Sequence, residues 1–512
     1  MVAEWLNQPP NTGNPLTEKK QPWSTGSAIY RSLSYAISFR FSEPKRPLSQ
    51  AFCRAGGKTL WTLVPNLDLD DDKFVWESYG SYWEQSPDQD QDQDQLSFAD
   101  VLSRIWVLRE SNPLKTFRLH WRCECDPILV DRWVRTAIAH DLEELNLYLC
   151  LAQPFYLPCT LFSFAKTLLV LKLTGCNIDS FSRLLSCCPV LQDLFLFIET
   201  NNCDGKKDCN FKIIVDTPSS FLGFPSLKIL HLQGVNSANQ DSFSRLLSCC
   251  PVLQDLFIQT NNCDGKKDCN FKIIVPTLKR LHLSIYLSHY QLEINAPALE
   301  YLYFKGILGK DVVLGNLNLS NLIKAVVHVK LLSQCVEDLE DAGNRALDFI
   351  RALYNVEALH LDTDTTECLC KASKLDLPMF HNLALLEFCV ESCMWHVLPL
   401  FLERAPKLEK LILHKEDRNF EEPTERCPTS IEWMFYKDIP KCLSSHLTDF
   451  HFKGFKGLKN ELELVRHILK WARFLEKMRV SSDPLDSEKK IRVLKQLLMF
   501  PRLSMTCEIE FN

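Results

Sequence analysis

A six-residue pattern, Leu-x-x-Leu-x-Leu with Val, Ile, Phe or Ala allowed as substitutes, recurs along most of this chain. In a β-strand, successive side chains alternate between the two faces, so the last two apolar residues of each copy point the same way. One such strand cannot bury its apolar side alone, whereas a stack of strands can. Copies begin at Leu114, Leu142, Leu168, Leu191, Leu227, Leu253, Leu278, Leu299, Leu322 (the weakest), Val356, Leu383, Leu408 and Leu447.

The spacing of the copies identifies the kind of repeat. Most copies start 21 to 28 residues after the previous one, and leucine-rich repeats have a period of about 20–29 residues. Proline cannot continue a helix and marks the turn into a strand; it stands two residues before the first leucine at Pro189, Pro225, Pro251, Pro276, Pro297 and Pro406. We therefore predict the α/β class and a leucine-rich-repeat solenoid, a horseshoe with a parallel sheet on its concave face.

A longer duplication lies inside the repeats. Residues 180–215 recur almost unchanged at 242–275, and the second copy is two residues shorter within its strand. Losing two residues keeps the same side chains facing inward, whereas losing one would invert them. We interpret this as a tandem duplication that the solenoid tolerates because each repeat contacts only its neighbours.

The composition excludes several classes of protein. The net charge of −6 argues against a chain that coats nucleic acid or anionic membrane. Gly57-Lys58-Thr59 lacks the first glycine of a phosphate-binding loop, and neither His-Glu-x-x-His nor Gly-x-Ser-x-Gly occurs. We expect a protein that is not an enzyme and has no cofactor, no nucleic-acid partner and no membrane partner.

The 22 cysteines show no Cys-x-x-Cys spacing, so we predict no metal site of the usual zinc-ribbon or RING kind. No secretory signal or membrane span is recognised. We therefore expect a cytoplasmic and/or nuclear location, with most cysteines serving as small buried hydrophobic residues.

The outward side of the predicted strands carries the candidate site. Aromatic residues and arginine are the types that most often anchor protein interfaces. An ordinary solvated face, or aromatic residues covered by a loop, is the alternative interpretation. The candidate partner-binding residues on the concave face are Phe195, His231, Phe257, Arg280, His282, Tyr301, Tyr303, His360 and His414.

The two ends of the chain differ from the middle. Residues 1–59 form a divergent segment, residues 76–97 an acidic low-complexity linker, and residues 98–420 the predicted repeats. Residues 430–512 are expected to form a small α+β cap on the last repeat. Its predicted helices are Glu461–Met478, with Asn460 as N-cap and Glu463 at the third position, and about Ser487–Phe500; its strands are Leu447–Phe452, one near Val480, and Thr506–Phe511.

Several stretches resemble the plant F-box/FBD/LRR-repeat family. They are Leu60–Asp70, Arg118–Trp121, Thr167–Leu173, Leu184–Leu191 and Ile439–Ser444, and they appear in the family's order. The resemblance covers about residues 60–512 and implies that 60–75 is a remnant of the F-box C-terminal end and that 430–512 is FBD-like. Residues 1–59 show no recognisable F-box pattern, so we expect the F-box to be truncated or replaced.

The resemblance also implies a function. It predicts a substrate-recognition subunit of a Skp-cullin-F-box ubiquitin ligase, with an unknown target protein bound by the repeats. A Skp-type adaptor would be a partner only if a degenerate F-box is functional. The alternative is an F-box-less LRR/FBD interaction protein that recruits no ubiquitin ligase.

Overall fold

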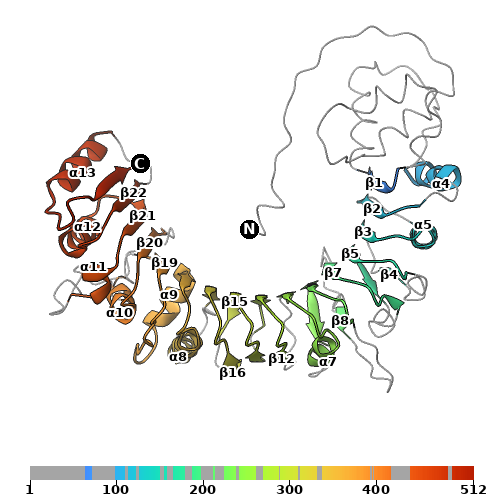
Figure 1. The fold of residues 1–512 in the computed structure, drawn as a ribbon, viewed down its shortest axis with the longest axis horizontal. Coiled ribbons are helices and arrows are strands. Elements are labelled where there is room, and N and C mark those ends of the chain that lie inside the picture. The colour runs from blue at the N-terminus through green and yellow to red at the C-terminus, as the bar shows by residue number, and fades with distance from the viewer. Residues whose placement is uncertain are drawn as a thin grey trace, which may run out of the picture.

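The computed structural model is a horseshoe built on one continuous parallel sheet of 16 strands (Figure 1). The sheet lines the concave side, and helices and short outer strands cover the convex side. The structure describes residues 64–71, 98–109, 113–122, 126–149, 155–157, 165–178, 187–197, 211–213, 224–237, 242–260, 269–287, 289–308, 312–330, 337–391, 395, 397–416, 439–482 and 487–512.

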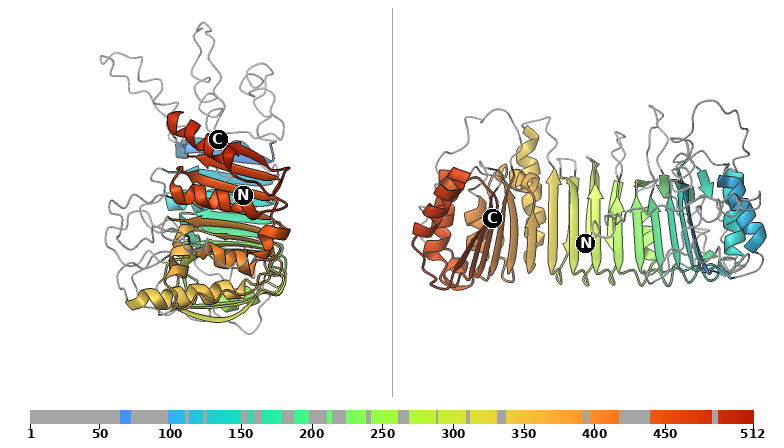
Figure 2. Two further views of the ribbon diagram at one scale, coloured as in Figure 1. Left: turned by 90° about the vertical axis from the view of Figure 1, so that its left-hand side faces the viewer. Right: turned by 90° about the horizontal axis from the view of Figure 1, so that it is seen from above.

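Thirteen of the sheet's strands are the predicted ones, and each begins two residues after the first residue of a motif copy. They lie side by side along the horseshoe (Figure 2). The strands are β2 (Thr116–Trp121), β3 (Glu144–Leu149), β5 (Val170–Thr174), β7 (Asp193–Phe197), β9 (Ile229–Gln233), β11 (Asp255–Gln259), β13 (Arg280–Ile285), β15 (Tyr301–Ile307), β17 (Lys324–Lys330), β18 (Ala358–Leu361), β19 (Leu385–Val390), β20 (Lys410–Lys415) and β21 (Asp449–Phe455).

The convex side differs between regions. Near the ends it carries helices, whereas in the middle it is a parallel three-stranded sheet, β12–β14–β16, which the repeat pattern did not predict. The helices are α4 (Phe98–Arg109), α5 (Pro127–Ile138), α7 (Ser242–Ser248), α8 (Glu337–Ala352), α9 (Thr363–Cys370) and α10 (Val397–Arg404). The outer strands are β4 (Phe155–Leu157), β6 (Cys176–Ile178), β8 (Phe211–Ile213), β10 (Val235–Ser237), β12 (Cys269–Ile274), β14 (Tyr290–Asn295) and β16 (Val312–Asn318).

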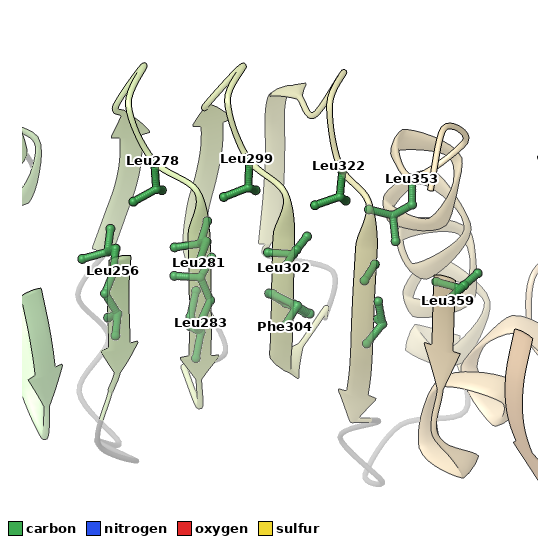
Figure 3. Close-up of a cluster of buried hydrophobic side chains, with 14 of the residues drawn as sticks. Leu256, Leu278, Leu281, Leu283, Leu299, Leu302, Phe304, Leu322, Leu353 and Leu359 are labelled. Atoms are coloured by element: carbon green, nitrogen blue, oxygen red, sulfur yellow. The ribbon is translucent and has the colours of Figure 1, made fainter. Parts of the chain in front are cut away.

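The core lies between these two layers. The three apolar residues of each motif form three buried rows along the solenoid, and Figure 3 shows one part of them, including Leu278, Leu281 and Leu283. Leu281 pairs with Leu256 on one side and with Leu302 on the other. Stacking thus gives each inner strand two neighbours with the same pattern of buried residues, which is why the repeated pattern specifies the fold.

The sheet runs past both predicted boundaries of the repeats. Strand β1 (Asn66–Asp70) lies in the segment that we compared with the end of an F-box, yet it pairs in parallel with β2. Its residues Leu67 and Leu69 are buried beside Phe117 and Leu119. The predicted division at residue 98 therefore does not coincide with a break in the sheet, whereas residues 1–59 and 76–97 lie outside the described residues.

The C-terminal region extends the sheet as well. Strands β21, β22 (Lys477–Ser482) and β23 (Glu508–Phe511) continue it in register beyond β20, and α11 (Lys441–Ser445), α12 (Lys459–Trp471) and α13 (Ser487–Met499) cover their convex side. We expected a small α+β cap on the last repeat here. The three strands carry the same alternation of buried and outward residues as the repeats, so the region stacks as further turns of the solenoid.

The predicted helix Glu461–Met478 was wrong at both ends. Helix α12 begins at Lys459 and ends at Trp471, and Met478 lies in strand β22. Leu458 is the N-cap and Glu461 the third residue, in place of Asn460 and Glu463. The Glu461 carboxylate accepts hydrogen bonds from the backbone N–H groups of Leu458 and Lys456, at 3.0 and 2.8 Å. The side chain of the third residue therefore caps this helix.

The structure describes the side chains of nine cysteines, and none of these nine forms a disulfide. Six of them are buried: Cys188, Cys250, Cys368, Cys389, Cys442 and Cys507. Within the described segments no helix combines the length and the apolar character needed to cross a membrane.

Candidate protein-binding site on the concave face

The register of the sheet places outward side chains in rows across the concave face. One row passes through the centre of the strands, because each parallel pair aligns equivalent motif positions. Its members from β2 to β19 are Arg118, Asn146, Lys172, Phe195, His231, Phe257, His282, Tyr303, Val326, His360 and Glu387.

Rings occupy the middle of this row except at Val326, where His328, at the next outward position of the same strand, contacts both Tyr303 and His360. We call the following residues the aromatic row: Phe195, Phe197, His231, Phe257, His282, Tyr303, His328 and His360. Each ring contacts the next, with centroid separations from 3.7 Å between His231 and Phe257 to 6.4 Å between Phe195 and Phe197. The row crosses seven strands, from β7 to β18.

The tightest part of the aromatic row consists of the rings of His231, Phe257, His282 and Tyr303. Phe257 lies 4.1 Å from His282 with planes 27° apart, and His282 lies 3.9 Å from Tyr303 with planes 13° apart. Parallel strands are spaced about 4.8 Å apart, so flat rings at the same register meet face to face. The stack presents ring edges to the hollow of the horseshoe.

The two central histidines are uncharged at neutral pH. Burial, with a smaller contribution from the neighbouring His282, lowers the pKa of His231 to about 3. Burial likewise lowers the pKa of His282 to about 4, with smaller contributions from His328 and Lys305. His282 Nε2 is 3.2 Å from Ser284 Oγ. The centre of the aromatic row is therefore neutral and largely apolar.

Charged groups border the N-terminal end of the row. Lys172 Nζ lies 5.1 Å from the ring centroid of Phe195, within the range of a cation–π contact. Its amino group is also 3.9 Å from the carboxylate of Glu144, which pairs with Arg118 at 3.1 Å. These side chains link the first aromatic ring to an ion-pair network on β2, β3 and β5.

A second network borders the C-terminal end. His360 Nδ1 is 3.1 Å from Glu387 Oε2, and Lys453 Nζ is 3.5 Å from the other oxygen of Glu387. These partners, His360 first, hold the pKa of Glu387 at about 2. His328 Nδ1 is 2.9 Å from Asp362 Oδ2. The C-terminal end of the aromatic row therefore contacts the carboxylates of Glu387 and Asp362.

Six of the nine predicted residues lie in the aromatic row, and three do not. Arg280 and Tyr301 each lie two residues before the aromatic-row residue of their strand. Arg280 Nε donates to Asp255 Oδ1 at 2.6 Å. His414 lies one outward position later, with its Nδ1 4.0 Å from Cys389 Sγ. The structure therefore divides the predicted set into a central row and two flanking positions.

Sequence reasoning missed four residues of this surface: Phe197, His328, Glu387 and Lys453. Phe197 occupies the outward position after Phe195, and His328 lies in a strand from which no candidate was selected; alternation along the strand predicts an outward side chain at both positions. Glu387 and Lys453 carry no local signal that distinguishes them from other charged residues on a strand face. Only the structure shows that Glu387 contacts His360 and that Lys453 contacts Glu387.

The internal duplication supplied two of the rings. Asp193-Leu194-Phe195 on β7 and Asp255-Leu256-Phe257 on β11 are the two copies of one strand, and His231 of β9 stands between the two phenylalanines. Both copies keep leucine inward and phenylalanine outward, as expected when a strand loses two residues. The duplication therefore lengthened the aromatic row.

The fold and this surface define the class: a leucine-rich-repeat solenoid with a row of aromatic side chains on its concave face. Comparison with known proteins shows what the chain resembles. Residues 437–480 match the family model FBD, and residues 205–315 match the model described as FBD-associated F-box protein At5g56370, LRR repeats. These two regions are therefore similar to the plant F-box/FBD/LRR-repeat proteins.

Relatives from Arabidopsis thaliana extend this similarity along most of the chain. FBD-associated F-box protein At3g52670 is 27% identical, with 89% of each chain covered. F-box/FBD/LRR-repeat protein At3g52680 is 28% identical, covering 89% of this chain and 86% of that protein. The family and the repeat fold indicate a protein-interaction adaptor of a non-enzymatic kind.

Proposed function

We propose that the concave face binds a target protein and that the aromatic row supplies the central contacts. The observation that carries this proposal is the unbroken contact of rings across seven strands of the sheet. Aromatic anchors in the centre of an interface, surrounded by polar groups, are the usual arrangement of binding hot spots. The two ion-pair networks at the ends of the row would form the polar rim.

The dimensions of the row suggest the form of the bound segment. Six strand spacings of about 4.8 Å give a row about 29 Å long. An extended peptide advances about 3.3 Å per residue, so about nine residues would span it. We expect apolar or aromatic side chains of the target over the neutral centre, near Phe257 and Tyr303, where burying a charge would be unfavourable.

We further propose that the chain acts as a substrate-recognition subunit resembling those of Skp-cullin-F-box ubiquitin ligases. The names of its relatives, which include the F-box, support this role. The alternative is an LRR/FBD interaction protein that recruits no ligase, because the sequence of residues 1–59 shows no F-box pattern. In either role we propose a cytoplasmic and/or nuclear location.

Two measurements test these proposals separately. Binding of the full-length chain to a purified Skp-type adaptor tests ligase recruitment, with an F-box protein that carries a recognisable F-box as positive control. Binding by the control alone would contradict the ligase role and favour the alternative. This assay leaves the concave face untested, because the two proposals rest on different parts of the chain.

Cross-linking mass spectrometry tests the concave face. The wild-type chain is compared with Phe257→Ala/Tyr303→Ala and with Tyr354→Ala, which removes a half-exposed ring from the segment after α8. We expect the double substitution to weaken target capture by about 2 kcal/mol or more, and Tyr354→Ala to leave it unchanged. Equal capture by all three proteins would contradict the proposed site.

A further inference from the structure

A second group of chemically distinctive side chains lies on the same face, at the carboxyl ends of β19 and β20. It consists of Cys389, His414 and Glu416, whose sulfur, imidazole nitrogen and carboxylate oxygen lie within 4.8 Å of one another. Cys389 and His414 are register partners in adjacent strands, and Glu416 follows β20 directly. The sheet therefore brings together residues about 25 positions apart, which no local spacing in the sequence reveals.

We propose that Cys389, His414 and Glu416 form a site for a zinc ion. Zinc accepts thiolate, imidazole and carboxylate ligands together, at about 2.3, 2.0 and 2.1 Å. Tetrahedral angles then place sulfur and nitrogen about 3.6 Å apart, whereas Cys389 Sγ and His414 Nδ1 are 4.0 Å apart. A movement of a few tenths of an ångström, which a side-chain rotation provides, closes the site around the ion.

The surroundings of the three groups suit a cation. Thr363 at the start of α9 is completely buried, and its hydroxyl donates to Glu416 Oε2 at 2.8 Å. This hydrogen bond fixes the carboxylate and leaves Oε1 to face the ion, which is the role of an outer-shell partner. Burial, together with the nearby charges of Glu416, Glu387 and Asp362, raises the pKa of the Cys389 thiol to about 12, and Lys453 acts in the opposite direction.

Three protein ligands leave one position of a tetrahedral ion open. Because the site lies in a strand-end row of the concave face, this position would face the hollow of the horseshoe and hold water or a side chain of a bound protein. Zinc binding replaces the proton of the Cys389 thiol, which passes to solvent. The inference does not depend on the identity of any target.

A second cluster of ligand types, Asp70, Asp71 and His120, is a weaker candidate. Two of its carboxylate oxygens already form hydrogen bonds. Asp70 Oδ1 is 3.1 Å from His120 Nδ1, and Asp71 Oδ2 accepts from the N–H of Arg122 at 2.7 Å. These hydrogen bonds explain the cluster without an ion.

The test measures zinc and cobalt binding by the purified full-length chain under reducing conditions. Zinc affinity and stoichiometry are measured by competition with a chromophoric chelator, and Co²⁺ replaces zinc to report the ligands by absorption. We expect the wild-type protein to show a thiolate-to-cobalt charge-transfer band. Cys389→Ser should abolish this band and remove one equivalent of tightly bound zinc.

Matched variants separate loss of the site from loss of the fold. Cys370→Ser alters another cysteine nearby, on α9, and should leave the band and the stoichiometry unchanged. Thr363→Val removes the hydrogen bond to Glu416 and should lower zinc affinity by approximately 10- to 100-fold. Glu416→Gln keeps the shape of the side chain but removes a ligand, so it should lower zinc affinity by more than Thr363→Val does. Circular dichroism checks folding, and an unchanged cobalt spectrum in folded Cys389→Ser or folded Glu416→Gln would overturn the proposal.

Discussion

Lys415 and Glu461 form a buried ion pair that joins the FBD-matching region to the preceding repeats. Lys415 Nζ lies 2.8 Å from Glu461 Oε1, and the two side chains are 2% and 0% exposed. Lys415 occupies an inward position of β20, where the repeat pattern calls for an apolar residue. Glu461 reaches it from the first turn of α12, so these strands and helices share one core.

The backbone brings the same two regions together. At Gly454 the pairing of β21 with β22 shifts register, and the residue has a φ of +72°. A Cβ at this position would lie 2.3 Å from the carbonyl oxygen of Lys415. The close approach of β20 and β21 therefore requires glycine and holds the ion pair in place.

The first prediction concerns this pair. Glu461→Ala leaves the Lys415 charge buried without its partner and also removes the cap of α12. We expect the free energy of unfolding to fall by about 3–5 kcal/mol, measured by urea denaturation. Glu488→Ala in α13 removes an exposed partner of Arg492 and should change stability by about 0–1 kcal/mol. Equal effects of the two substitutions would contradict the structural role of the pair.

The second prediction compares a buried position of strand β9 with an exposed position just before it. Leu230→Ala creates a cavity in the completely buried row below β9 and should lower the free energy of unfolding by about 2–5 kcal/mol. Lys228→Ala changes an exposed residue just before that strand and should stay within about 0.5 kcal/mol of wild type. The comparison uses the midpoints of urea denaturation curves that have equal denaturant dependence. A loss of less than about 1 kcal/mol for Leu230→Ala would argue against the prediction that Leu230 faces the core.

The third prediction follows from the neutral histidines. The pKa values of His231 and His282 are about 3 and 4 in the fold, against 6.5 in the unfolded chain. As pH falls below 6.5, the unfolded chain binds protons that the folded chain does not, so stability decreases through pH 4 to about pH 3 and then levels off. The decrease is on the order of a few kcal/mol.

Urea denaturation at neutral pH and near the lower end of that range measures the slope. His231→Phe/His282→Phe keeps the rings but removes the titrating groups, so its stability should depend less on pH across the same range. Full retention of the wild-type slope by the double variant would mean that other groups cause the acid sensitivity.

The repeat architecture was predictable from the sequence because burial of leucine at fixed positions leaves little freedom. The thirteen motif starts give thirteen strands, and Leu230 and Leu232 face inward as expected. The sequence did not reveal that α12 begins at Lys459, because the buried Glu461 is explained only by its partner Lys415 on another strand. The sequence likewise predicted the helices and strands of the C-terminal cap but not that its strands continue the repeat sheet.

The candidate site was predictable in its residue types and less so in its arrangement. Alternation within a strand shows that Phe257 and His282 face outward, but contact between them depends on register across strands. The meeting of Cys389, His414 and Glu416 has the same origin. Local patterns therefore predict which side chains line the concave face, and only the structure shows which of them act together.

The duplication makes the last prediction an internal comparison. Phe257 lies between His231 and His282, with centroids at 3.7 and 4.1 Å, whereas Phe195 contacts His231 at 5.7 Å and Lys172 at 5.1 Å. Closely stacked rings contribute about 0.5–1.5 kcal/mol beyond the area that they bury. Phe257→Ala should therefore lower the free energy of unfolding more than Phe195→Ala does, although both residues come from the same duplicated strand. Equal losses in urea denaturation would show that inward packing alone determines the stability of these strands and that the stacked row contributes nothing to it.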